Sequence, residues 1–301
     1  MTPPATASVL SALVRRLRHL EIRIHQAVEA QLQGSFHSVF RGTGLEVDEV
    51  RLYQYGDEVR AIDWAVSSKG HGTFVKTYKE EREQQVLLLL DVSASLAQVG
   101  DAGQRKLDLG RDLAGLLALS AARQDAPLGM LAFSSQKELY MPPAKGPRAA
   151  YALIQRLFAL APTSAQTDLR AGIRQALGLL KHRSLVLLIS DFIDLNYERE
   201  LTMLARQHDL IVVQLQAPRE AAFPALGIVP LRDAETGRTQ WVNTSSAMFR
   251  ARHAAEARHQ QEELRQLCRR QRAGFLALRT DDDFVPQLVS LFRQRNRRGR
   301  G

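Results

Sequence analysis

The stretch Val86-Leu-Leu-Leu-Leu90 runs directly into Asp91-Val-Ser93-Ala-Ser95. An apolar run of this length that ends in an acid predicts a fully buried strand of a parallel sheet. The acid and the two hydroxyls then fall at the carboxyl end of the strand, where open α/β sheets bind their ligands. Carboxylate and hydroxyl oxygens are hard ligands that suit a small divalent cation. The stretch therefore predicts a central strand and a candidate cation site at its end.

Two later segments extend this candidate site. Thr167 lies just before an apolar pattern of helical spacing, and the apolar run 185–189 leads through a serine into Asp191. We therefore predict one cation site formed by Asp91, Ser93, Ser95, Thr167 and Asp191. The alternative interpretation is three unrelated turns, in which Thr167 simply caps a helix.

Taken in this order, the five residues resemble the metal-ion-dependent adhesion site (MIDAS) of von Willebrand factor A domains. Three motifs precede the first strand: Arg41-Gly-Thr-Gly-Leu-Glu46, Gly56-Asp57-Glu-Val-Arg60-Ala-Ile-Asp63-Trp64 and Val75-Lys-Thr-Tyr-Lys-Glu-Glu81. With them, residues 35 to 295 resemble the bacterial domain-of-unknown-function 58 (DUF58) family of von Willebrand A-like proteins. The chain departs from the family's usual pattern at Ala65, where Lys or Arg is common, and at Leu96, where Met is common.

The resemblance implies a function as well as a fold. Ser93, Ser95 and Thr167 would give hydroxyl oxygens to one Mg²⁺ or Mn²⁺ ion, and Asp91 and Asp191 would act mainly through bound water. Neutral hydroxyl ligands leave much of the cation's charge available for a carboxylate of another protein. The family resemblance also implies a MoxR-type AAA+ ATPase as partner. This chain would then be a non-enzymatic adaptor or co-chaperone that links the ATPase to an unknown client.

The alternation of apolar runs and helical patterns from residue 85 onward predicts a doubly wound, mostly parallel α/β sheet flanked by helices. We expect residues 1–84 to be an N-terminal helix (7–33) and a family-specific extension with short strands near 49–53 and 73–78. Residues 85–296 would be the von Willebrand A-like domain, with a β-hairpin insertion at about 217–245. Residues 297–301 would be a basic tail.

Composition excludes several classes of protein. Of the 301 residues, 45% are apolar, which is enough for a packed core. The single cysteine, Cys268, cannot form an internal disulfide and suits a reducing compartment. No apolar stretch approaches the roughly 20 residues needed to span a bilayer, and Arg15, Arg16 and Arg18 interrupt the apolar core that a signal peptide would need. We therefore expect a cytoplasmic protein without a membrane span.

The net charge of +9 raises the question of nucleic-acid binding. The arginines concentrate at the C-terminal tail and near helix ends, where cations are common for structural reasons. We therefore expect the charge to favour contact with an acidic protein surface, and a basic scaffold for nucleic acid remains an alternative.

An enzyme is not expected. The chain lacks the G-x-S-x-G, Walker-type and H-E-x-x-H motifs, and Asp91 lacks the second acid of an aspartate-based phosphatase. A Mg²⁺- or Mn²⁺-dependent hydrolase that uses the same acids is kept as an alternative. The residues Asp57, Arg60, Asp63 and Trp64 could form either a partly buried charge network with an aromatic anchor or a surface for a partner.

Overall fold

The chain divides into two compact units: residues 41–84, the small unit, and a main unit that includes all residues from 85 onward. The computed structural model describes residues 46–70, 72–79, 85–97, 104–164, 166–194, 196–218, 224–232 and 239–298. The helix expected at 7–33 lies outside the described residues. Of the basic tail expected at 297–301, residues 297 and 298 belong to the last helix (Phe284–Arg298), and 299–301 lie outside the described residues.

The small unit is built on an antiparallel strand pair. Strand β1 (Glu46–Leu52) pairs with β2 (Phe74–Lys79), which confirms the two short strands expected there. Between them lie the 3-10 turn η2 (Val59–Ala61) and the short helix α3 (Trp64–Ser67). The carboxylate of Asp63 accepts hydrogen bonds from the backbone N–H groups of Ala65 and Val66 and so caps α3.

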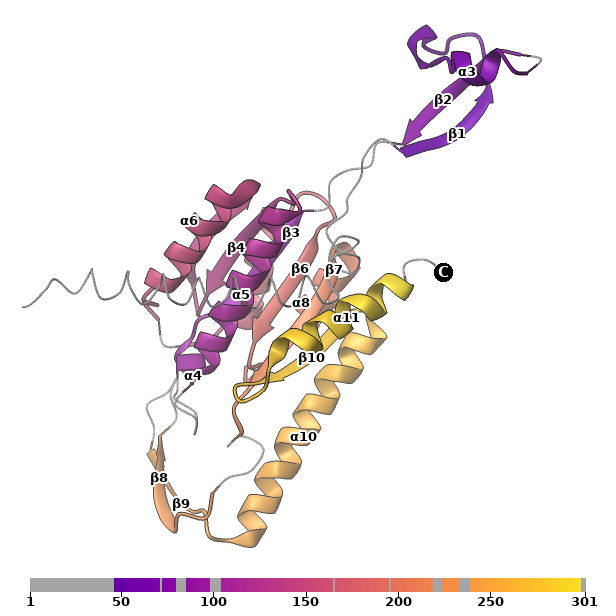
Figure 1. Ribbon diagram of the computed structural model, residues 1–301. Coiled ribbons are helices and arrows are strands. Elements are labelled where there is room, and N and C mark those ends of the chain that lie inside the picture. The colour runs from indigo at the N-terminus through magenta and orange to yellow at the C-terminus, as the bar shows by residue number, and fades with distance from the viewer. Residues whose placement is uncertain are drawn as a thin grey trace, which may run out of the picture. The chain divides into compact units, whose positions relative to one another are not determined.

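The main unit contains a six-stranded sheet with the strand order β10-β7-β6-β3-β4-β5 (Figure 1). Its strands are β3 (Val86–Asp91), β4 (Leu128–Phe133), β5 (Lys137–Ala144), β6 (Leu185–Ser190), β7 (Asp209–Gln216) and β10 (Gly274–Arg279). All neighbouring pairs are parallel except β4 and β5. The predicted mixed α/β fold with a mostly parallel sheet is therefore confirmed.

Helices cover both faces of this sheet because side chains alternate between the two faces along each strand. On β3, Leu88 and Leu90 pack into one apolar core and Leu87 and Leu89 into the other. The first core is completed by α5 (Lys106–Arg123), α6 (Gly146–Ala159) and α11 (Phe284–Arg298). The second is completed by α7 (Leu169–Leu179), α8 (Glu198–Gln207) and the end of α10 (Ala247–Arg270). Each fully buried leucine contributes about 1.5–3 kcal/mol, so β3 is anchored from both sides.

The order of the strands creates a switch point beside β3. The chain passes from β3 to β4 and β5 on one side of it, then crosses to β6, β7 and β10 on the other. In open α/β sheets, the crevice at the carboxyl ends of the strands where the order reverses is the usual ligand site. In this sheet, that crevice lies between the ends of β3 and β6.

Strands β8 (Ile228–Arg232) and β9 (Thr239–Asn243) form a separate two-stranded antiparallel sheet. The strands expected there are confirmed, and the view of 217–245 as an insertion stays a prediction. Among the helices of the described residues, none has the length and apolar character needed to cross a bilayer.

Candidate functional site

Asp91 lies at the carboxyl end of β3 and is held in place by hydrogen bonds to both of its oxygens. Its Oδ1 accepts from the backbone N–H of Ser93 at 2.9 Å, and its Oδ2 accepts from the hydroxyl of Ser190 at 2.7 Å. Burial away from water and the nearby charge of Asp191 raise the pKa of Asp91 to about 7. The carboxyl group is therefore rigidly placed, and a nearby cation would favour its ionised form.

Ser93 and Ser95 present their hydroxyls side by side next to this carboxylate. Both residues are buried, and Ser95 lies in the short helix α4 (Ala94–Ala97). The two Oγ atoms are 3.1 Å apart. In an octahedral Mg²⁺ site with bonds of about 2.0–2.1 Å, adjacent ligand oxygens are about 2.9 Å apart. The observed spacing therefore suits two neighbouring ligands of one small cation.

Asp191 faces the same edge of the sheet and already has one cationic partner. The ammonium group of Lys106 donates to Asp191 Oδ2 at 2.7 Å, and both side chains are buried. In the described part of the chain, Asp191 Oδ1 is buried and has no hydrogen-bond partner. Lys106 pairs with Asp191, whereas the oxygens of Asp91 accept from Ser93 and Ser190. A buried carboxylate oxygen without a partner, next to a second buried acid, is the feature that a bound cation would satisfy.

The loop that carries Thr167 is attached to the same edge. Thr167 is half-buried, and the next residue, Asp168, donates its backbone N–H to the carbonyl of Ser134 just after β4. The Asp168 side chain caps α7, and the N–H of Leu169 donates to Asp194 in the loop after β6 at 2.8 Å. The start of α7 therefore connects the ends of β4 and β6, on either side of β3.

Glu138 holds the preceding part of this loop against the β4–β5 turn. Its carboxylate accepts hydrogen bonds from the Ser134 hydroxyl, from the backbone and hydroxyl of Thr163, and from the backbone of Ser164. Burial alone would raise the pKa of Glu138, but these hydrogen bonds outweigh it and hold the pKa below its ordinary value. Glu138 is therefore a positioning residue for the loop that carries Thr167.

The structure brings Asp91, Ser93, Ser95 and Asp191 together, and it anchors the Thr167 loop at the same edge. Two residues of this cluster were missed from the sequence: Ser190, which donates to Asp91, and Lys106, which pairs with Asp191. Ser190 directly precedes a predicted site residue, so its position was a usable signal. Lys106 carried none, since it is one of many basic residues at helix ends.

No group of three or more His, Cys, Asp or Glu side chains that could hold a metal ion occurs within the described residues. Only two acids lie in the cluster described above. Any cation bound there would therefore depend on the serine and threonine hydroxyls, as expected from the D-x-S-x-S pattern.

The four motif residues of the small unit have separate roles in the structure. Asp57 accepts two hydrogen bonds from Arg51, which hold its pKa below the ordinary value. Asp63 caps α3, as described above, and Arg60 is exposed. Trp64 is 68% exposed, so it does not act as a buried aromatic anchor in this unit. Of the two interpretations, the exposed Trp64 agrees better with a surface for a partner.

Cys268 is buried in the second apolar core, and burial raises the pKa of its thiol to about 12. The thiol therefore behaves as a small apolar side chain, since a nucleophilic cysteine needs an accessible thiolate.

Comparisons with known proteins place this chain among uncharacterized relatives. It is 30% identical over 288 residues to the uncharacterized proteins Mb1516 of Mycobacterium bovis and Rv1480 of Mycobacterium tuberculosis, covering 95% of this chain and 90% of each relative. The crystal structure of the conserved hypothetical protein BatB from Bacteroides thetaiotaomicron aligns with a TM-score of 0.45 at 14% identity, covering 70% of this chain and 98% of that chain. The family described as "Protein of unknown function DUF58" matches residues 49–263. The chain therefore belongs to the DUF58 family.

Proposed function

We propose that this chain is a non-enzymatic, metal-dependent protein-binding module of the von Willebrand A-like class. One Mg²⁺ or Mn²⁺ ion would be held by Ser93, Ser95 and Thr167, with Asp91 and Asp191 acting mainly through water. The observation that carries the proposal is the buried Oδ1 of Asp191, which has no hydrogen-bond partner among the described residues, beside the paired serine hydroxyls at the switch point of the sheet. A rigid cluster of hard oxygens at this place suits a small divalent cation.

In the proposed site, some residues would hold the carboxylates in position and others would coordinate the cation. The hydrogen bonds from Ser93 and Ser190 hold the carboxylate of Asp91 in place, and Lys106 holds that of Asp191. Neither carboxylate therefore has to change its position when a cation binds. When bound, the metal would supply an open coordination position for a carboxylate oxygen of a partner's Asp or Glu. Because the hydroxyl ligands are neutral, Ser93, Ser95 and Thr167 would leave the cation enough positive charge to attract that carboxylate.

The identity of the partner rests on the family resemblance alone. On that basis we propose that the chain is a cytoplasmic adaptor or co-chaperone of a MoxR-type AAA+ ATPase, which it would connect to a client protein. The exposed Trp64 and Arg60 of the small unit are candidates for a second contact surface.

The metal site is tested by titrating Mg²⁺ and Mn²⁺ into the purified protein by calorimetry. We expect saturable binding in the wild type, loss of binding in Asp191→Asn, and an affinity at least about tenfold weaker in Ser95→Ala. Ser184→Ala is the matched control, because Ser184 is also a buried serine but lies at the amino end of β6. Equal binding in Ser95→Ala and Ser184→Ala, or no binding in the wild type, would exclude the proposed site.

The partner is tested by capture of a purified MoxR-type ATPase on the immobilised protein. Chelation alone is ambiguous, since the ATPase itself needs Mg²⁺ for nucleotide binding. The comparison of wild type, Asp191→Asn and Ser184→Ala at constant Mg²⁺ avoids this problem. If Asp191→Asn captures as much ATPase as the wild type does, the contact is not bridged by the metal. The hydrolase alternative is favoured by a different result: Mg²⁺-dependent turnover of phosphate or ester substrates that is lost in Asp91→Asn.

A further inference from the structure

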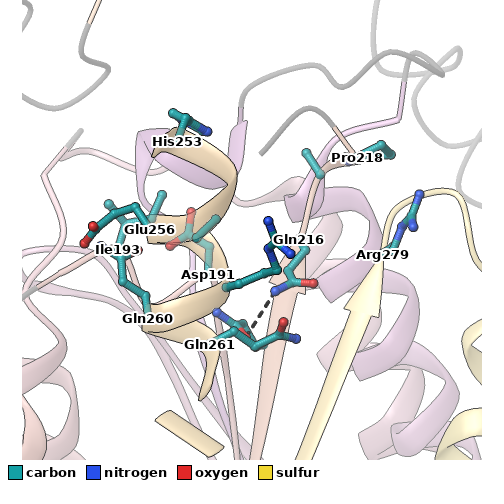
Figure 2. Close-up of a pocket in the computed structure, with 13 residues that line it drawn as sticks. Asp191, Ile193, Gln216, Pro218, His253, Glu256, Gln260, Gln261 and Arg279 are labelled. Atoms are coloured by element: carbon teal, nitrogen blue, oxygen red, sulfur yellow. Dashed lines mark hydrogen bonds between the residues drawn. The ribbon is translucent and has the colours of Figure 1, made fainter. Parts of the chain in front are cut away.

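A cavity of about 310 Å³ opens beside Asp191, on the face of the sheet that α10 covers (Figure 2). Its walls come from the loop after β6, from the end of β7, from the middle of α10 (253–261) and from Arg279 at the end of β10. Four of its lining residues are glutamines: Gln214 and Gln216 on β7, and Gln260 and Gln261 on α10. We call this cavity the carboxamide pocket.

The two walls formed by β7 and α10 carry glutamines at the level where the strands end. On β7, the residues that face α10 are apolar as far as Val212 and then become Gln214 and Gln216. On α10, the inward stripe is apolar at Leu264 and becomes polar one turn earlier, at Gln261. Gln214 is only 7% exposed, and its Oε1 accepts from Gln216 Nε2 at 3.3 Å. Amides on two facing elements of a partly apolar lining supply the convergent hydrogen-bonding groups that orient a ligand in a pocket.

The chemistry of the lining selects the class of ligand. A carboxamide offers a donor and an acceptor together, which match the C=O and N–H of a peptide group. Among the described residues that line the pocket there is no Phe, Tyr or Trp, and His253 is the one ring on which a nucleobase could stack. The pocket has two guanidinium groups: that of Arg279 is engaged by Asp281 at 2.7 Å, and the Nε of Arg258 donates to the carbonyl of Ala254 at 3.0 Å. Two acids, Asp191 and Glu256, also line the pocket and disfavour a phosphate there. These features favour a polypeptide over a nucleotide.

We propose that the carboxamide pocket binds a short polypeptide segment of the partner, next to the acidic residue that reaches the cation. The proposal rests on the proposed function and adds to it, because Asp191 belongs to the wall of the pocket and to the candidate metal site. The cation would bind a carboxylate of the segment, and the glutamines would form hydrogen bonds with the C=O and N–H groups of the neighbouring peptide units. The partner would then be recognised by a linear segment with one fixed acid.

The test uses a phage-displayed library of 12-residue peptides, selected on the full chain in the presence of Mg²⁺. The selected peptides should share one acidic residue, and its exchange for the amide should abolish binding. Gln216→Ala and Gln261→Ala should each weaken peptide binding about threefold to tenfold, because a net hydrogen bond contributes about 0.5–1.5 kcal/mol. Gln155→Ala, at an exposed glutamine of α6 outside the pocket, should leave the peptide affinity within twofold of wild type.

Mg²⁺ affinity is measured on the same variants, so that the two proposals fail in different ways. If Mg²⁺ binds and the glutamine variants hold the peptides as tightly as Gln155→Ala, the pocket proposal is wrong and the metal site stands. If the library yields no Mg²⁺-dependent binder although Mg²⁺ binds, the pocket proposal is equally overturned. If Mg²⁺ does not bind to the wild type, the proposed function fails and the pocket proposal fails with it.

Discussion

At the level of single residues, the charge of the candidate site depends on Lys106. Its ammonium group is the one cationic partner that the described residues provide for Asp191, and the pair is buried. Removing one member of a buried ion pair leaves an uncompensated charge, which costs about 3–5 kcal/mol. We therefore expect Lys106→Met to lower the free energy of unfolding by this amount in EDTA, as measured by urea denaturation. Added Mg²⁺ should restore more stability in the variant than it adds to the wild type.

Lys145→Met is the control for this experiment. Lys145 lies 3.9 Å from Asp125 in a partly exposed pair, and such surface pairs contribute about 1 kcal/mol or less. A similar loss in both variants, or a response to Mg²⁺ that is no larger in Lys106→Met than in the wild type, would show that Lys106 does not balance the charge of this site.

His208 gives a second prediction at this scale. It is buried at the end of α8, where its Nδ1 accepts from the backbone N–H of Ser184, and burial lowers its pKa below the ordinary value for histidine. The unfolded chain therefore binds a proton at a higher pH than the folded chain does, and His208 destabilises the fold as the pH falls through about 6.5. The stability advantage of the wild type over His208→Asn should shrink between pH 8 and pH 5.5 in urea melts. An advantage that stays constant over this range would contradict the prediction.

At the level of elements, the placement of α7 depends on Gly172. A Cβ atom added there would lie 2.5 Å from the ring of Phe133, the residue that pairs with Asp91 across β3 and β4. Both the ring and the glycine are buried, so the clash can be relieved only by a shift of α7 or of the ring. Gly172→Ala should therefore cost about 1–3 kcal/mol of stability and weaken Mg²⁺ binding, because α7 carries the Thr167 loop.

The same helix provides the matched control. A Cβ at Gly178 would meet nothing within 4 Å, so Gly178→Ala should stabilise the protein by up to about 1 kcal/mol through helix propensity alone. Thermal melts and calorimetry on the two variants distinguish the effects. Opposite signs of the stability change are expected, and a stable Gly172→Ala with unchanged Mg²⁺ affinity would contradict the role given to this glycine.

At the level of the whole molecule, the two units differ in how much apolar surface they bury. Among the residues of the small unit whose exposure is described, Val75 is the one fully buried apolar side chain, whereas the strands β3, β4 and β6 are buried throughout. Units with little buried surface open at low free-energy cost. In hydrogen exchange, the amides of β1 and β2 should therefore exchange well before those of β3 and β6. Equal protection in the two units would contradict this order.

Much of the main unit could be predicted because its signals are local. The apolar runs of β3 and β6 end in acids, and the helical patterns between them have clear spacing, so the parallel sheet and the edge that carries the cluster followed from the sequence. The small unit was harder to predict. The aromatic and charged residues from 57 to 64 suggested either a buried network or a surface, and the pattern itself could not decide that Trp64 is exposed and Asp63 is a helix cap.

The sequence by itself determined the central strand, the alternation of strands and helices, and the oxygen-rich residues at the strand ends, because strand burial and helical spacing are properties of neighbouring residues. Only the tertiary structure decided that Ser190 clamps Asp91 and that Lys106 pairs with Asp191, since these contacts join residues 99 and 85 positions apart. The carboxamide pocket has the same origin. Its two walls, β7 and α10, are separate in the chain and meet only because both pack against the second apolar core. Long-range packing, which no local pattern records, therefore decides how the charge of the candidate site is balanced.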